Sequence, residues 1–147
     1  MRYGRLRARC TQILGGDNIM TNIATALTDL LFDRQISVDT AFARHFTTDY
    51  RQRTDGVWSD NAEFVEHITH LRDVIADGRV EVHDELICGD RYADRHTVHA
   101  RKVDGSEVAF EVLVFAELAA DGRFQQIIET TTMLSGGAED RGLGSAR

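Results

Sequence analysis

The feature that most constrains this chain is a change of hydrophobic period close to residue 79. Before it, apolar residues recur at helical spacing; after it, they alternate along four segments at 79–88, 91–103, 107–119 and 123–134. Three dipeptides typical of hairpin turns separate these segments: Gly89-Asp90, Asp104-Gly105 and Asp121-Gly122. The second half of the chain therefore predicts an antiparallel meander of four strands.

Two helices and a short strand are predicted upstream. Ile23, Leu27 and Leu31 recur at helical spacing after Asp17-Asn18, which can cap a helix at about 19–33. Ser37 can cap a second helix that ends near residue 45. The segment 49–53 is a short mixture of polar and apolar residues, which favours a short strand.

The clearest helix follows this strand. Asp60 and Glu63 have the spacing of a capping box. The apolar residues that share one face of this helix are Phe64, Ile68, Leu71 and Ile75. Gly78 is expected to end the helix.

This order of elements predicts an α+β fold in which a curved antiparallel sheet, shaped like a cone, wraps around three N-terminal helices. The concave side of such a sheet would enclose a pocket for a small organic molecule. The strand around 112–116 is apolar on both faces, although one layer of helices covers only one face. We therefore expect a second copy of the chain on the outer face, which makes the protein a homodimer.

The composition excludes several classes of partner. The formal net charge is -7, so binding to nucleic acid is disfavoured. No stretch approaches 18 apolar residues, so no membrane partner is predicted. Cys10 and Cys88 form neither a disulfide framework nor a metal-binding spacing, which favours a reducing cytoplasm as the location.

The two ends of the chain differ from its centre. Residues 1–19 carry four arginines against one aspartate and have no apolar periodicity, so we expect this basic leader to lie outside the fold. The domain is expected to cover 20–135. The segment 136–147 is rich in glycine and polar residues, which predicts a flexible tail.

Several local patterns together resemble the nuclear transport factor two-like superfamily, also called SnoaL-like, over about 20–135. These patterns are the Asp49-Tyr50 strand after Phe46, the helix 64–71, the segment Cys88-Gly89-Asp90-Arg91-Tyr92-Ala93, and Asp121-Gly122-Arg123-Phe124 followed by Glu129. The nearest branch is bacterial and of unknown function. The resemblance implies isomerase, cyclase or hydrolase chemistry without a cofactor.

Two enzymes of the superfamily provide tests of this resemblance. The positions of the catalytic tyrosine and two carboxylates of ketosteroid isomerases fall near Leu30/Leu31, Thr54 and Val114. None of these side chains can carry out the proton transfer of those enzymes. At two of the positions that correspond to catalytic residues of limonene epoxide hydrolase, this chain has residues of the same kind, Arg95 and Glu129. The same comparison places Gln52, Thr54 and Thr97 where that enzyme has its water-holding residues and a further carboxylate.

Glu129 is the leading candidate for a catalytic residue, because a carboxylate on a mostly apolar strand face is either paired or functional. His67 lies at the edge of the buried helix face and can act as a general base; the alternative is a histidine held by one structural partner. Arg95 would stabilise negative charge, or would instead form a structural salt bridge with Glu129.

The expected ligand-binding residues are Tyr50, Gln52, Thr54, Trp58, His96 and Thr97. His96 and His99 must face opposite sides of a strand, and the sequence leaves open which of them faces the pocket. Trp58 is a candidate pocket lip or an ordinary packing residue. Glu63, His67 and His70 have a metal-like spacing, but two of them would point away from the core, so no metal is predicted.

Two functions remain open at this point. The first is binding of a compact, partly apolar molecule with acid–base catalysis by Glu129 and His67. The alternative is a non-catalytic ligand-binding or dimerisation module.

Overall fold

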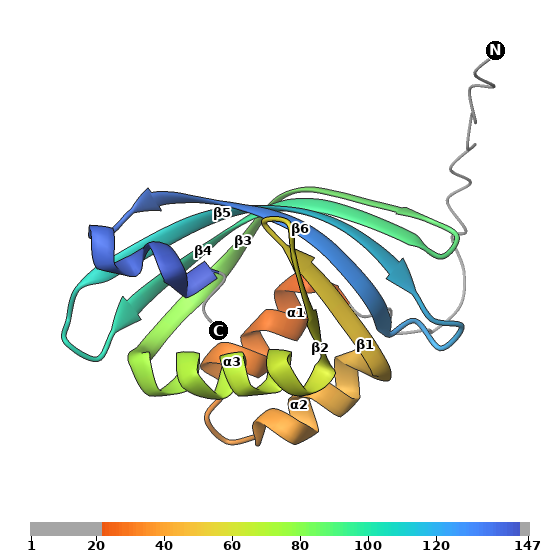
Figure 1. Ribbon diagram of the computed structural model, residues 1–147, viewed down its shortest axis with the longest axis horizontal. Coiled ribbons are helices and arrows are strands. Elements are labelled where there is room, and N and C mark those ends of the chain that lie inside the picture. Colours follow the sequence, from red (N-terminus) through yellow and green to blue (C-terminus); the bar gives the residue numbers. More distant parts are fainter. Residues whose placement is uncertain (1–21, 145–147) are drawn as a thin grey trace, which may run out of the picture.

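A six-stranded sheet arches over a layer of helices in the computed structural model, which describes residues 22–144 (Figure 1). The strands are β1 (Phe46–Thr54), β2 (Val57–Asp60), β3 (Ile75–Cys88), β4 (Arg91–Lys102), β5 (Glu107–Leu118) and β6 (Phe124–Ser135). Their order in the sheet is β2-β1-β6-β5-β4-β3. The predicted meander is confirmed, because β3, β4, β5 and β6 are antiparallel neighbours.

The sequence had suggested a fully antiparallel sheet, but the sheet also contains a parallel pair of strands. β1 pairs in parallel with β6, whereas β2 returns antiparallel along β1 after a turn at Asp55-Gly56, where both φ angles are positive. Parallel pairing of distant segments leaves no turn signal in the sequence. The four residues of β2 are also too few for a pattern of alternation to stand out.

The helices follow one another in the predicted order, but the first helix begins later than predicted. α1 (Ile23–Leu27) continues as a π-helical segment, η1 (Thr28–Phe32), and its cap is Asn22, whose side chain accepts a hydrogen bond from the Thr25 amide at 2.9 Å. The predicted caps Asp17 and Asn18, like the basic leader, lie outside the described residues. α2 (Val38–His45) is capped by Ser37 as predicted.

The third helix, α3 (Asn61–Val74), carries the predicted capping box but does not end at Gly78. It ends at Val74, and β3 begins at the next residue, so that Gly78 lies within the strand. A Cβ atom at Gly78 would lie 2.3 Å from the His99 carbonyl oxygen and 2.6 Å from the Phe32 ring. This glycine is therefore required by close approach of η1 and β4, and not by a helix stop.

The core lies between the concave sheet face and the helices. An aromatic cluster fills the end near α2, where the ring of Phe46 lies 4.6 Å from that of Tyr50 and 5.3 Å from that of Phe64. On β5, alternate residues such as Val112 and Val114 are buried against the helices. Leu113, between them, points to the convex face and is 50% exposed.

Beyond β6, the described part of the expected tail contains a further short helix. Residues Ala138–Gly144 form a 3-10 helix, η2. Its Asp140 carboxylate forms an ion pair with the Lys102 ammonium at 2.6 Å and also accepts a hydrogen bond from the Gly137 amide. Because the pair is nearly closed off from water, it ties η2 to β4, a long-range contact that a glycine-rich segment does not reveal.

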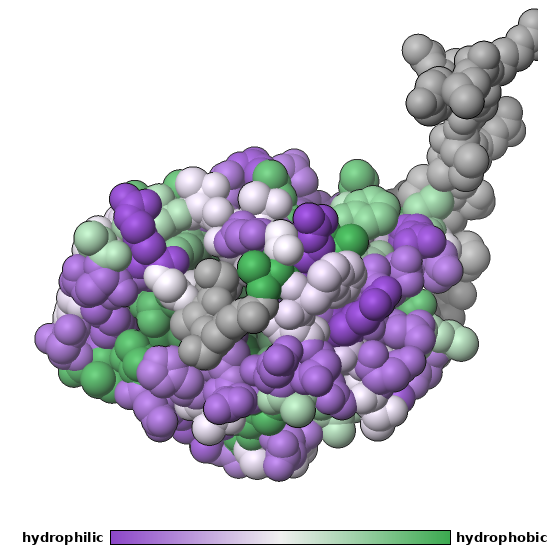
Figure 2. Space-filling view, viewed as in Figure 1, coloured by the Kyte–Doolittle hydropathy of each residue, from purple (hydrophilic) through white to green (hydrophobic). Residues whose placement is uncertain are grey.

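The surface agrees with the charged composition. On the face seen in Figure 2, hydrophilic residues predominate and hydrophobic ones form small, separate groups. Within residues 22–144, no helix has both the length and the apolar character needed to cross a membrane.

Gly78→Ala should lower the free energy of unfolding by about 1–3 kcal/mol, because the added methyl group would force η1 away from the β3–β4 ladder. Chemical denaturation measures this loss. Gly142→Ala in η2 is the matched control, since a Cβ there meets open space. Equal stability of both variants would show that Phe32 does not approach β3 closely.

Candidate functional site

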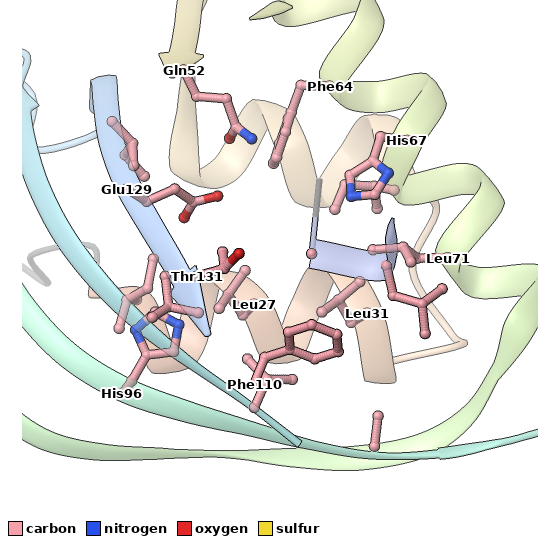
Figure 3. A pocket seen from close by; sticks show the side chains of 18 of the residues that line it. Leu27, Leu31, Gln52, Phe64, His67, Leu71, His96, Phe110, Glu129 and Thr131 are labelled. Carbon is pink, nitrogen blue, oxygen red and sulfur yellow. The ribbon is translucent and has the colours of Figure 1, made fainter. Parts of the chain in front are cut away.

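The helices cover the concave face of the sheet without filling it. A cavity of about 110 Å³ remains between α1, α3 and the sheet. Its walls are mainly apolar, and its polar residues are Tyr50, Gln52, His67, His96, Glu129 and Thr131 (Figure 3). A larger hollow of about 470 Å³ adjoins it, because Gln52, Phe64, His67 and Gly144 line both spaces.

A hydrogen-bond chain along β1 ends on Glu129. Tyr50, Gln52 and Thr54 alternate along the strand and therefore share its inner face. The Tyr50 hydroxyl donates to Gln52 Oε1 at 2.8 Å, and Gln52 Nε2 donates to Thr54 Oγ1 at 3.0 Å. Thr54 Oγ1 in turn donates to Glu129 Oε1 at 2.8 Å, because the parallel register places these two residues side by side.

The ionisation of Glu129 is shifted toward neutral pH. Burial raises the pKa of this carboxyl to about 7, against the opposing effects of the Thr54 hydrogen bond and the nearby His96. Burial and the Glu129 charge together raise the pKa of Tyr50 well above its usual value. A carboxyl group with a pKa near 7 can both accept and donate a proton at physiological pH.

A second ionisable pair lies on β4. His96 Nδ1 and Asp94 Oδ2 are 2.8 Å apart, and the exposed fractions of the two side chains are 1% and 0%. Burial raises the pKa of Asp94, while the hydrogen bond to His96 opposes that rise. Within the described part of the chain, Asp94 Oδ1 has no hydrogen-bond partner.

The strand register brings this pair close to Glu129. Val114 on β5 pairs with Asp94 on one side and with Glu129 on the other. In the same way, Val112 lies between His96 and Thr131. Two adjacent rows across the sheet therefore carry the polar groups at this end of the cavity.

His67 lines the same cavity from α3, and Figure 3 shows it across the space from Glu129. Burial, and next the charge of His70, lower the pKa of His67 to about 4, so it is neutral near pH 7. Its Nδ1 is buried without a hydrogen-bond partner among residues 22–144. Glu129 and His67 thus share a cavity, but the histidine that acts on the pKa of Glu129 is His96.

Arg95 does not enter the cavity. Its guanidinium binds the carboxylates of Asp84 at 2.8 Å and Glu111 at 3.3 Å on the convex face. The expected salt bridge to Glu129, and the expected stabilisation of charge in the pocket, are therefore wrong. The reason is the alternation of side chains along β4, where His96 faces inward and its neighbour must face outward.

The same alternation decides two further residues of β4. Thr97 Oγ1 lies 2.7 Å from His83 Nε2, and His99 Nε2 lies 3.1 Å from Glu81 Oε2. Neither Thr97 nor His99 lines the cavity. Of the two histidines left open by the sequence, His96 is the one that faces the cavity.

Trp58 lines neither the cavity nor the adjoining hollow, so it is not a pocket lip. It is 43% exposed on β2, and the Arg51 guanidinium lies over its ring, 4.6 Å from the centroid. Its neighbours Val57 and Ser59 face the hollow instead. Strand β2 was not predicted from the sequence, so there was no basis for deciding which of its side chains face inward and which face outward.

Sequence reasoning missed Asp94 and Thr131. The signal for Asp94 was present, since two residues of a strand separated by one position share a face, and Asp94 precedes His96 in this way. Thr131 follows Glu129 by the same rule. Within residues 22–144, no three His, Cys, Asp or Glu side chains come together as a metal site.

A curved sheet closed by helices around a small cavity defines a class of α+β domains with a pocket at the centre. A family model described as a SnoaL-like domain matches residues 29–127. An uncharacterised protein of Schizosaccharomyces pombe is 34% identical over 112 residues, which cover 76% of this chain and 85% of that protein. The chain belongs to the SnoaL-like family.

Solved structures agree on the fold. A nuclear transport factor two-like protein of unknown function from Exiguobacterium sp. 255-15 superposes with a TM-score of 0.57 and 18% identity, over 73% of this chain and 95% of that one. A candidate isomerase from Rhodopseudomonas palustris gives a TM-score of 0.60 and 14% identity, over 74% and 83%. At these identities the likeness establishes the α+β fold, and the predicted fold class is confirmed.

Glu129→Gln should stabilise the protein at high pH. The folded pKa near 7 exceeds the usual 4.5, so the folded state holds a proton that the unfolded state releases between these values. Stability due to this group is present below about pH 4.5 and is lost as the pH rises through 7. The variant should therefore gain about 3 kcal/mol over the wild type between pH 4 and pH 8.

Chemical denaturation at both pH values measures this gain. Comparison with Glu129→Gln cancels the opposite contribution of His67, which is present in both proteins. Glu66→Gln, at an exposed position of α3, is the control for removing a carboxyl group. A gain that does not depend on pH would mean that Glu129 ionises as it does in water.

Proposed function

We propose that this protein binds a compact, mostly apolar organic molecule and moves a proton on it without a cofactor. Glu129 is the group that takes the proton and returns it. The observation that carries this proposal is a carboxyl group with a pKa near 7 at the polar end of an apolar cavity. Thr54 holds one of its oxygens and leaves the other for a ligand.

Isomerisation suits this arrangement better than hydrolysis or cyclisation. A carboxylate that removes a proton from one carbon and returns it to another completes a cycle with no second reactant. The apolar walls strengthen the electrostatic interactions of Glu129 with a bound molecule, because little water remains to screen them. Two of the similar structures are named as candidate isomerases, which is compatible with this choice.

The other polar residues of the cavity take supporting roles in this proposal. Tyr50, Gln52 and Thr54 bond to one another and orient Glu129. His67 is neutral and offers Nδ1 as a hydrogen-bond partner for the ligand at the junction with the outer hollow. This role replaces that of a general base, since a pKa near 4 makes His67 a weak base.

A second proposal concerns the convex face, which we infer to be a homodimer interface in a cytoplasmic protein. Leu113 and Phe115 are 50% and 55% exposed there, and Phe115 lies between Ala93 and Ile128 in the cross-strand register. Exposed apolar side chains in adjacent rows are typical of a buried interface. A second copy placed on the same patch would bury both sets by symmetry.

The proton-transfer proposal can be tested without knowing the substrate. 5-Nitrobenzisoxazole is a compact probe that opens when a base removes one carbon-bound proton. The wild type should accelerate this reaction with a kcat/KM that rises with pH to a plateau above about 7, the pKa of Glu129. Glu129→Gln should lower kcat/KM by roughly 10²–10⁴.

Glu66→Gln, in the outer hollow, is the control and should keep the wild-type rate. Binding of the probe without turnover would contradict catalysis and support the alternative, a non-catalytic binding module. Turnover that survives in Glu129→Gln would move the proton acceptor to another residue.

Light scattering tests the interface. The wild type should have twice the mass of one chain at micromolar concentration, and Phe115→Glu should have the mass of one chain, because the new charges would face each other across the interface. Val103→Glu is the matched control, since Val103 is 67% exposed but lies in the β4–β5 turn. A wild type that is a single chain excludes the dimer.

A further inference from the structure

We propose that η2 is a hinged lid over the cavity, and that ligands enter and leave the cavity when this helix swings away. Gly136 and Gly137 form the hinge, Leu143 is the side chain that closes the cavity, and the ion pair between Lys102 and Asp140 is the latch. The inference goes beyond the proposed function, because a lid serves an enzyme and a non-catalytic binding module alike.

η2 forms part of the wall between the cavity and the outer hollow. Leu143 lines the cavity, and the next residue, Gly144, lines both spaces. Figure 1 shows η2, the short blue helix after β6, running back beneath the sheet toward α3. A helix in this position closes the cavity while it stays in place, and it joins the cavity to the outer hollow when it moves away.

The other residues that separate the two spaces are held in place. The ring of Phe64 packs 5.2 Å from that of Tyr50 and 5.3 Å from that of Phe46. The side-chain amide of Gln52 forms hydrogen bonds at both of its ends within β1. His67 lies in the middle of α3, which has 14 residues. Of the four described residues that line both spaces, the remaining one belongs to η2.

η2 is anchored more weakly than the other helices. Among the described elements, α1, α2 and α3 each pack against several neighbours, whereas η2 contacts few. Its seven residues include two glycines, which are poor helix formers. The position of η2 therefore depends strongly on the ion pair between Lys102 and Asp140, whose side chains are only 10% and 6% exposed.

The chain can turn at the point where η2 begins. Gly136 and Gly137 separate the end of β6 at Ser135 from the start of η2 at Ala138. The φ angle of Gly136 is 138°, in a region that residues with a side chain rarely adopt. Two consecutive glycines can absorb large changes of backbone angle at little cost, which is what a hinge at the end of an element requires.

The lysine of the latch has a second carboxylate within reach. Lys102 Nζ lies 2.6 Å from Asp140 Oδ1 and 3.8 Å from Asp104 Oδ2. Asp104 belongs to the β4–β5 turn and is exposed, so it does not move with η2. When η2 swings away, Lys102 keeps a carboxylate partner and Asp140 gains water. Opening therefore avoids the main cost of breaking a buried ion pair, which is a buried charge left unpaired.

A disulfide between η2 and β6 tests the lid directly. A Cβ at Gly144 would lie 3.5 Å from the Cβ of Thr131, which is within the range of disulfide-linked cysteines. Gly144→Cys combined with Thr131→Cys should therefore cross-link on oxidation, in a chain that also carries Cys10→Ser and Cys88→Ser. Fluorobenzene is the probe, because it is compact, apolar and neutral, and its fluorine NMR signal reports exchange between the bound and free states.

The reduced form of the same protein is the control. The oxidised form should release fluorobenzene roughly 10-fold more slowly than the reduced form, because the disulfide keeps the lid closed. Equal rates in the two forms would overturn the inference, and so would failure of the two cysteines to cross-link. A wild type that takes up no fluorobenzene at millimolar concentration would also overturn it. None of these outcomes depends on the ionisation of Glu129, so the lid and the proton transfer fail separately.

Asp140→Asn tests the latch without a cross-link. Loss of the charge weakens the bond to Lys102, so the open form should be more populated, and association and dissociation of fluorobenzene should both become roughly 10-fold faster. Asp77→Asn is the matched control, because Asp77 forms an ion pair of the same length, 2.6 Å, with Arg101, the neighbour of Lys102 on β4. Acceleration by both variants, or by neither, would show that the ion pair of Asp140 is not the latch.

Discussion

The concave face of the sheet is the constraint on which the rest of this structure depends. It must bury the alternate residues of β4, β5 and β6, and only short helices are available to cover it. Aromatic rings pack together at the end near α2, where Phe42, Phe46 and Phe64 meet. Toward η2 the helices and the sheet diverge, and the uncovered space becomes the cavity, which Leu143 of η2 helps to close.

Burial in this low-dielectric cavity shifts the pKa values of acidic and basic side chains in opposite directions. Burial raises the pKa values of Glu129 and Asp94 and lowers that of His67, because in each case it disfavours the charged form. Glu129, with a pKa near 7, can change its protonation state there near neutral pH, and the hydrogen bond from Thr54 fixes its position.

The sequence predicted the elements better than it predicted their faces. The capping box at Asp60 and the meander are local features, and both were predicted correctly. Alternation along β4 showed that His96 and His99 face opposite sides but could not decide which side is the cavity, since both faces of this strand hold polar residues. For the same reason Arg95 was assigned to the wrong face. The parallel pairing of β1 with β6, which joins Thr54 to Glu129, depends on residues 75 positions apart and leaves no local signal.

The cross-strand register also places two carboxylates in one row of the sheet. The row is Thr54–Glu129–Val114–Asp94, with one residue from each of four neighbouring strands. Thr54 donates a hydrogen bond to Glu129, its neighbour in the row. Because the residues of the row come from segments far apart in the chain, no local pattern in the sequence shows that Glu129 and Asp94 belong to it together.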